Sequence, residues 1–142
     1  MEKIIWNNNY SIGNEWIDNQ HKQIIKMINT LVDNYSSLDA SSDQLHDLLN
    51  GMTDYFRYHF EDEEKFLEEI AFPELEKHKK LHIDYIDKAV DLNFDVLLKK
   101  DNVANTMMQF LIHWWENHIL IEDLKYKEFL SKAKNDLTKG TS

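Results

Sequence analysis

Residues 42–69 read SDQLHDLLNGMTDYFRYHFEDEEKFLEE and carry the pattern that decides the fold. Apolar and aromatic side chains recur in this segment at steps of three and four residues, which places them on one face of a helix. The residues of this face are Leu45, Leu48, Met52, Tyr55, His59, Glu63 and Phe66. The segment is therefore predicted to be an amphipathic helix whose buried face also carries a histidine and a glutamate.

Three further segments have the same periodicity and are predicted to be helices. The first runs from about Asp18 to Ser36. The third runs to about Leu98 and starts at Pro73, a residue that suits the first turn of a helix. The fourth begins near Asp101, whose side chain can cap it.

A non-helical arm that ends near Gly13 precedes these helices, and a short helix around Tyr126 follows them. The connections between the helices are short, so consecutive helices are expected to be antiparallel neighbours. The sequence therefore predicts an all-α fold with one domain over residues 1–142. Its architecture is an up-down-up-down antiparallel four-helix bundle with a non-helical N-terminal arm and a short C-terminal helix.

The composition agrees with a helical protein and argues against several classes of function. Three glycines and one proline in 142 residues are too few for the turns of a β-sandwich or barrel. The absence of cysteine excludes disulfides, iron–sulfur clusters and thiolate-bound metals. A net charge of −10 argues against nucleic acid and membrane surfaces as partners. Because no apolar segment is suited to a signal peptide or a membrane span, we expect a cytoplasmic protein.

Five histidines and one glutamate lie on the apolar faces of the predicted helices, where a polar side chain needs a compensating partner. They are His21, His59, Glu63, His78, His82 and His118. The first and third helices carry these residues near their starts, and the second and fourth carry them near their ends. Because the helix direction alternates, all six, together with Asp123, are predicted to meet at one end of the bundle.

Asp123 joins this group only if its helix is distorted. His118 and Asp123 are five residues apart, which separates them by about 140° on an ideal α-helix. A π-type or terminal turn would bring both to one face, and such turns are common at functional sites. Tyr126, one turn beyond Asp123, is assigned equally to core packing and to a hydrogen bond beside the site.

The donor set indicates a pair of metal ions. Imidazole and carboxylate groups without thiolate suit iron, manganese or zinc. Five imidazoles and two carboxylates exceed the number of ligands that one ion holds. If both carboxylates bridge, and an oxide or hydroxide bridges as well, two six-coordinate ions keep a single open position. Such a vacancy suits a small ligand.

The order of these motifs resembles the hemerythrin family, most closely its single-domain bacterial members. The opening run Trp6-x3-Tyr10-x2-Gly13-x4-Asp18-x-Gln20-His21 is similar to the first motif of the family. The pairs that match its later motifs in order are His59-x3-Glu63, His78-x3-His82 and His118-x4-Asp123. The likeness extends over nearly the whole chain, from Trp6 to about Tyr126.

The resemblance implies two non-haem iron ions, Fe2+ or Fe3+, joined by a bridging oxide or hydroxide. The implied ligands are His78, His82 and His118 for one iron, His21 and His59 for the other, and Glu63 and Asp123 as bridges. Dioxygen would bind reversibly at the iron with two histidines, so a carrier, store or sensor is expected and not an enzyme. The implied ligand pocket consists of Phe60, Trp114, Ile121 and Trp6.

Two other functions stay open on the sequence. A di-iron enzyme could act on peroxide, nitric oxide or ferrous iron, although the Glu-x-x-His pairs of ferritin-like enzymes are absent. A plain metal-binding or partner-binding bundle could hold zinc or manganese. Transport, storage and sensing share one site, and a separate oxygenase or signalling protein is an open partner.

Several other polar residues are predicted to lie outside the site. His46 is expected on the surface and His113 is expected not to be a ligand, because each is out of phase with the neighbouring donor. The acidic run in the second helix is expected to form a solvated face apart from its one donor. The members of that face would be Glu61, Asp62 and Glu64.

Overall fold

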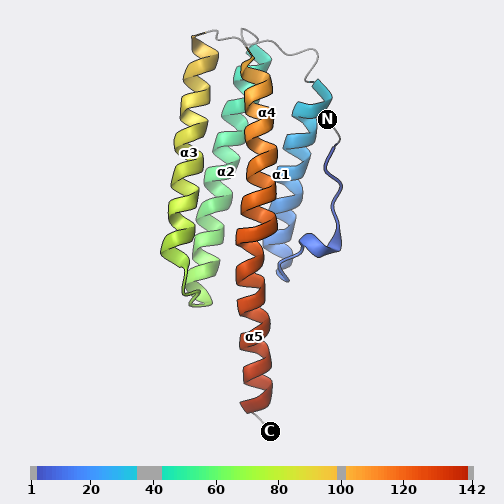
Figure 1. Cartoon of the computed structure of the whole chain (residues 1–142), viewed down its shortest axis with the longest axis vertical. Helices are drawn as coiled ribbons and strands as arrows, with labels where there is room; N and C mark the ends of the chain where they lie inside the picture. Colours follow the sequence, from blue (N-terminus) through green and yellow to red (C-terminus); the bar gives the residue numbers. More distant parts are fainter. Residues whose placement is uncertain (1–2, 35–42, 99–101, 141–142) are drawn as a thin grey trace.

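The computed structural model describes residues 3–34, 43–98 and 102–140, and it confirms the all-α bundle. The helices are α1 (Glu15–Asn34), α2 (Asp43–Glu69), α3 (Leu75–Leu97), α4 (Val103–Trp114), a π-helix (Trp115–Asp123) and α5 (Leu124–Gly140). The first four α-helices alternate in direction and lie side by side, with α1 next to α2 and α4, and α3 next to α2 and α4 (Figure 1). This is the predicted up-down-up-down topology.

The helix boundaries differ from the expected ones by a few residues. Helix α1 starts at Glu15, because the Asn14 side chain accepts a hydrogen bond from the backbone N–H of Ile17 and so caps the first turn. Helix α3 starts at Leu75, so Pro73 precedes the first turn instead of forming it. Asp101, the expected cap of α4, lies outside the described residues.

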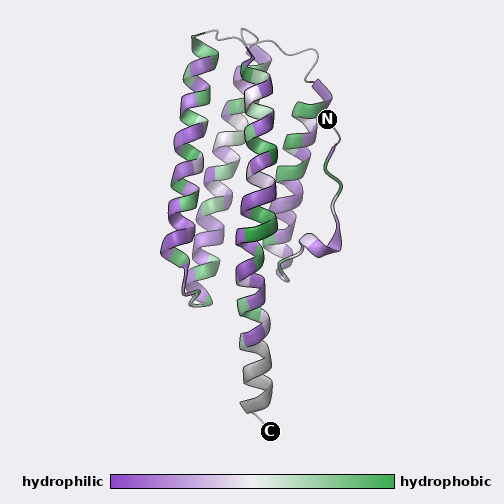
Figure 2. Ribbon diagram, viewed as in Figure 1, coloured by the Kyte–Doolittle hydropathy of each residue, from purple (hydrophilic) through white to green (hydrophobic). Residues whose placement is uncertain are grey.

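The interior consists of two apolar clusters with a polar layer between them. The larger cluster fills most of the bundle and includes the fully buried Phe56. The smaller one lies at the end where α2 turns into α3, and its buried members are Ile12, Ile17, Leu67, Phe72 and Tyr126. In Figure 2, hydrophobic residues recur along each helix between hydrophilic ones, as expected of amphipathic helices around a shared core.

The N-terminal arm is extended apart from a short 3₁₀ turn (Asn8–Tyr10), and it runs beside α1 (Figure 1). The Asn29 side chain holds it by accepting from the Ile4 N–H and donating to the Ile4 carbonyl, both at 2.8 Å. At the other end, the Asp18 carboxylate accepts from the Ile12 N–H at 2.9 Å. Gly13, with a φ of 83°, turns the chain into α1.

The fourth helix, the π-helix and α5 form one continuous rod that extends beyond the bundle (Figure 1). The C-terminal helix is therefore longer than predicted, with 17 residues. Its first turns stay attached to the bundle because Leu124, Tyr126 and Phe129 pack into the smaller apolar cluster. Among the described residues, no helix is both long enough and apolar enough to cross a membrane.

Candidate metal centre

Seven side chains from α1, α2, α3 and the π-helix form the polar layer between the two apolar clusters. They are His21, His59, Glu63, His78, His82, His118 and Asp123, and each is at most 4% exposed. The residues that the sequence places at one end of the bundle therefore do meet there. The distances between their donor atoms define how these side chains could bind metal ions.

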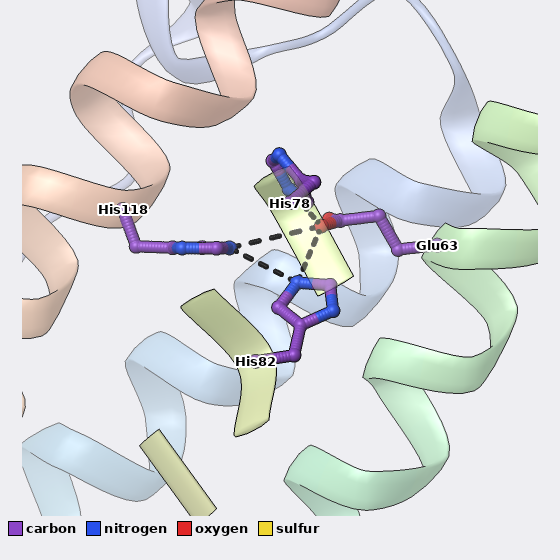
Figure 3. A group of neighbouring side chains, drawn as sticks. All are labelled: Glu63, His78, His82 and His118. Carbon is purple, nitrogen blue, oxygen red and sulfur yellow. Dashed lines mark hydrogen bonds and ion pairs between the residues drawn. The ribbon is translucent and has the colours of Figure 1, made fainter. Parts of the chain in front are cut away.

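One oxygen of Glu63 lies among three histidines (Figure 3). Its Oε1 atom is 2.7 Å from Nε2 of His78, 3.1 Å from Nε2 of His82 and 3.7 Å from Nε2 of His118. The Nε2 atoms of His82 and His118 are 3.2 Å apart. These four donors lie within 4.8 Å of one another and could hold one ion.

The other oxygen of Glu63 lies between the remaining two histidines. Its Oε2 atom is 3.5 Å from Nε2 of His21 and 3.3 Å from Nε2 of His59. Asp123 completes this second group of four donors, with its Oδ2 atom 3.2 Å from Nε2 of His21. The two groups share Glu63, which gives one oxygen to each.

Asp123 also has one oxygen toward each group. While Oδ2 faces His21, its Oδ1 atom lies 2.9 Å from Nε2 of His78 and 3.2 Å from Nε2 of His118. Both carboxylates are therefore placed to bridge two ions, one with three histidines and one with two. This is the arrangement that the family resemblance implies.

The spacing of the donors fits metal ions better than it fits hydrogen bonds. Two donors held about 2.1 Å from one ion at right angles lie about 3.0 Å apart, close to the distances found here. Despite these short distances, several buried donor atoms have no hydrogen-bond partner: His21 Nε2, His59 Nε2 and both carboxylate oxygens of Asp123. Unpartnered buried polar atoms are costly, and ions between the two groups would satisfy them.

The π-helix brings Asp123 into the site, as the sequence predicted. It covers Trp115–Asp123, and its i→i+5 hydrogen bonding puts residues five apart on one face. His118 and Asp123 are therefore both buried and in contact. The same change of phase turns Ile121 outward, where it is 52% exposed.

Two predicted pocket residues are consequently corrected. Ile121 is three residues after His118, a spacing that faces inward in an α-helix but not in the π-helix. Trp6 lies on the N-terminal arm, where it packs against the larger apolar cluster and contacts Tyr10 and Lys22 instead of the seven donors. Ile121 is not on the inner face but lines a surface pocket together with Trp114 and His118.

The other two predicted pocket residues lie against the three-histidine group. Phe60 stacks on the His82 ring, with centroids 3.9 Å apart and planes 6° apart. Trp114 stacks on the His118 ring, with centroids 5.0 Å apart and planes 13° apart. These stacked rings restrict the orientation of both imidazoles.

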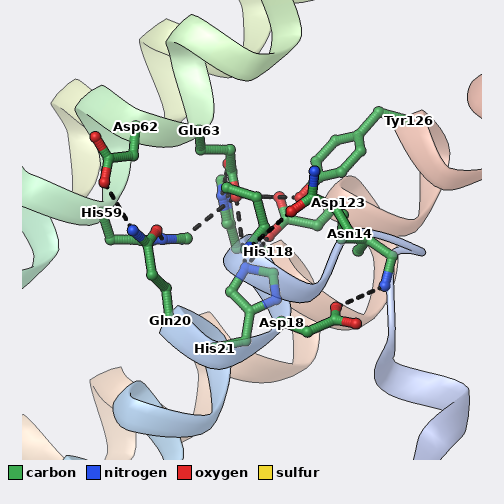
Figure 4. Close-up of polar contacts among 12 residues, drawn as sticks. Asn14, Asp18, Gln20, His21, His59, Asp62, Glu63, His118, Asp123 and Tyr126 are labelled. Atoms are coloured by element: carbon green, nitrogen blue, oxygen red, sulfur yellow. Dashed lines mark hydrogen bonds and ion pairs between the residues drawn. The ribbon is translucent and has the colours of Figure 1, made fainter.

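Hydrogen bonds to the outer ring nitrogens orient His59 and His82, and Figure 4 shows the one at His59. The Gln20 side chain lies between His59 and Asp62, with Oε1 2.7 Å from Nδ1 of His59 and Nε2 donating to Asp62 at 2.7 Å. On the other side, Nδ1 of His82 lies 3.1 Å from the Glu64 carboxylate. Metal-binding histidines usually have such an acceptor behind them.

The expected solvated face on α2 is therefore only partly present. Asp62 is buried and Glu64 is half-buried, because α1 and α3 bring polar partners to them. Gln20 was not identified from the sequence as supporting the site, although it directly precedes His21 in the first motif. Tyr126 has both assigned roles: it is fully buried, and its hydroxyl donates to Glu63 at 3.2 Å.

Two histidines lie outside the site. His113 is exposed, as expected of a residue that is not a ligand. His46 is half-buried instead of fully on the surface, and its ring nitrogen Nε2 lies 3.1 Å from the Asn50 side chain.

The buried carboxylates hold positive charge on the neighbouring histidines. Burial alone lowers the pKa of His21 and His78, but contacts with Asp123 and Glu63 outweigh it and raise the pKa values to about 9 and about 10. Burial acts to raise the pKa of Glu63 and Asp123, yet the histidines hold both below their ordinary values. The pKa of His59 is lowered, chiefly by burial. Both carboxylates are therefore ionised, as metal binding requires.

Known proteins similar to this chain are hemerythrins. A family model described as the hemerythrin HHE cation binding domain matches residues 12–130. The chain is 28% identical to a bacteriohemerythrin of Clostridium acetobutylicum over 127 residues, which cover 87% of this chain and 98% of that protein. It is also 28% identical to a bacteriohemerythrin of Pseudomonas paraeruginosa over 142 residues, which cover 100% of this chain and 91% of that protein.

A solved structure is similar as well. The crystal structure of a hemerythrin mutant superposes with a TM-score of 0.79 at 25% sequence identity, over 90% of this chain and 97% of that one. The family model covers most of the chain, including all seven donors. The chain therefore belongs to the hemerythrin family, as the order of its motifs predicted.

Proposed function

We propose that the seven buried side chains hold two non-haem iron ions and that the protein binds dioxygen reversibly at this pair. The observation that carries the proposal is the sharing of Glu63 and Asp123 between a three-histidine and a two-histidine group. An anion that faces both groups offsets the repulsion between two cations, so the pair is favoured over a single ion. Family membership supports iron as the metal.

The unequal numbers of histidines define where a small ligand would bind. One ion would be held by three histidines, His78, His82 and His118, and the other by two, His21 and His59. The open coordination position would therefore lie on the ion that is held by two histidines. When bound, the iron pair would supply the electrons that dioxygen takes up. His21 and His59 are fully buried, and this burial excludes bulk water from that position.

The protein groups around the site favour release of the ligand unchanged. Within the described part of the chain, the hydroxyl that contacts the donors is that of Tyr126, and it donates to Glu63. Burial and the nearby carboxylates raise the pKa of Tyr126 well above its ordinary value, so it keeps its proton. Without a ready proton source a reduced oxygen species is not driven forward, which suits a carrier, store or sensor in the cytoplasm more than an enzyme.

The test is a spectroscopic cycle. Metal-free protein is loaded anaerobically with ferrous iron, exposed to air and then returned to argon, while the visible spectrum is followed. We expect a coloured form that disappears on removal of dioxygen and returns over several cycles. Prompt oxidation that argon does not reverse, or turnover of peroxide or nitric oxide far above that of free iron, would replace this proposal with an enzymatic one.

A further inference from the structure

We propose that Glu64 and Gln20 make the two metal positions electronically unequal, with Glu64 strengthening His82 as a donor on the three-histidine side. The inference rests on the proposed function, because it concerns the same pair of ions. Both are positioning residues: each acts through a histidine and neither belongs to the two groups of donors. The difference between them is one of charge, a carboxylate behind His82 and an amide behind His59.

Glu64 is aligned with the far edge of the His82 ring. Its Oε2 atom lies 3.1 Å from Nδ1 of His82, while Nε2 of the same ring faces Glu63 inside the site at 3.1 Å. The stacked Phe60 ring fixes the plane of the imidazole. A carboxylate accepts but does not donate, so Nδ1 carries the proton and Nε2 keeps a free lone pair directed at the site.

Gln20 fixes His59 in the same tautomer by a different route. Asp62 accepts a hydrogen bond from Nε2 of Gln20, which turns the amide oxygen toward His59 at 2.7 Å from Nδ1. His59 must then donate from Nδ1, and its Nε2 lone pair also faces the site. Here the group in contact with the ring is neutral, and the charge of Asp62 is one residue further away.

The charge of the acceptor changes the imidazole. A carboxylate behind a metal-bound histidine raises the basicity of the ligand, and it does so more than a neutral amide. A stronger anionic donor stabilises the more highly charged ion, so Glu64 should favour the ferric state at the three-histidine position. The side chain of Glu64 is 26% exposed, so solvent weakens this effect but does not remove it.

The test compares Glu64→Gln with the matched control Glu61→Gln. Both substitutions remove one negative charge from the same surface pocket between α2 and α3, but only Glu64 contacts His82. Anaerobic titration with cobalt(II) measures binding without any dioxygen chemistry. We expect wild type and Glu61→Gln to bind two ions per chain equally well, and Glu64→Gln to bind one of the two about tenfold more weakly.

A redox measurement on the iron-loaded chain separates electronic from structural effects. Glu64→Gln should raise the reduction potential, and a tenfold change in relative ferric and ferrous binding corresponds to about 59 mV. The double variant Gln20→Glu with Asp62→Asn keeps the chain of hydrogen bonds from His59 through residue 20 to residue 62. It moves the negative charge from residue 62 to residue 20, next to the His59 ring, and should therefore lower the reduction potential. Thermal unfolding of metal-free Glu64→Gln should match that of wild type.

The outcomes separate this inference from the proposed function. Fewer than two cobalt ions in the wild-type chain would overturn the proposed function itself. Two ions in wild type, with Glu64→Gln and Glu61→Gln indistinguishable in affinity and potential, would leave the proposed function standing and overturn the role of Glu64.

Discussion

Replacement of Tyr126 by phenylalanine should destabilise the protein through the loss of one hydrogen bond. The Tyr126 hydroxyl and the Glu63 carboxylate are both fully buried, and the bond between them is 3.2 Å long. A hydrogen bond to a charged group contributes roughly 1.5–3 kcal/mol to stability. The phenylalanine ring keeps the packing against Phe66 and Phe72, so the cost should be close to that of the bond alone, about 2 kcal/mol.

The measurement is thermal and urea unfolding of metal-free protein. For a chain of this size, about 2 kcal/mol corresponds to a decrease in Tm of roughly 4–8 °C. Tyr85→Phe is the matched control: its ring is also buried, and among the described residues its hydroxyl has no hydrogen-bond partner, so a change of less than about 0.5 kcal/mol is expected. If Tyr126→Phe were as stable as Tyr85→Phe, Glu63 would not be the buried, ionised acceptor that the site requires.

Four further predictions concern the metal, the protons and the core. Glu63→Gln should bind at most one metal ion per chain, because it removes the anion shared by both groups; two tightly bound ions in this variant would show that Glu63 is not a bridge. At pH 7, metal loading should release at least about two protons per chain, detected with an indicator dye, because His21 and His78, with pKa values of about 9 and about 10, are charged beforehand. These two pKa values exceed that of an unfolded histidine, so protonation of His21 and His78 stabilises the metal-free chain fully below about pH 6.5. This stabilisation is lost as the pH rises through 9 and 10. A metal-free chain whose free energy of unfolding increases between about pH 6.5 and 10 would contradict the raised pKa values. Phe56→Ala should cost about 3–5 kcal/mol in urea unfolding, since its fully buried ring contacts Phe60, Tyr85 and Trp114; a loss below about 1 kcal/mol would mean that the core is not packed as described.

Much of the fold and the donor set could be predicted because both depend on periodicity. The steps of three and four residues fix which face of each helix is buried, and short connections fix the alternating direction. The depth of a donor then follows from its distance to the helix end, which is why His21 and His118 could be placed together although they are 97 residues apart. The five-residue step to Asp123 made a distortion of the fourth helix the condition for this residue to join the donors, and the π-helix meets that condition.

The predictions that were wrong concern features of the structure that do not follow from the periodicity of the sequence. Continuing the α-helical phase past Trp114 put Ile121 on the inner face, whereas the π-helix shifts every later residue. The arm that carries Trp6 has no periodic pattern, so its path along α1 could not be derived. The sequence pattern of α2 does not show that Asp62 and Glu64 are partly or fully buried, because their partners, Gln20 and His82, lie on other helices.

We infer that one buried layer of donors holds two ions that share the carboxylates of Glu63 and Asp123. The most direct measurement is the ratio of iron to chain, determined on one sample by elemental and amino-acid analysis after anaerobic loading and gel filtration. We expect two irons per chain, bound tightly enough to remain on the protein during gel filtration. A ratio of one or less, or equal loss of iron from wild type and from a variant that lacks both Glu63 and Asp123 carboxylates, would contradict it.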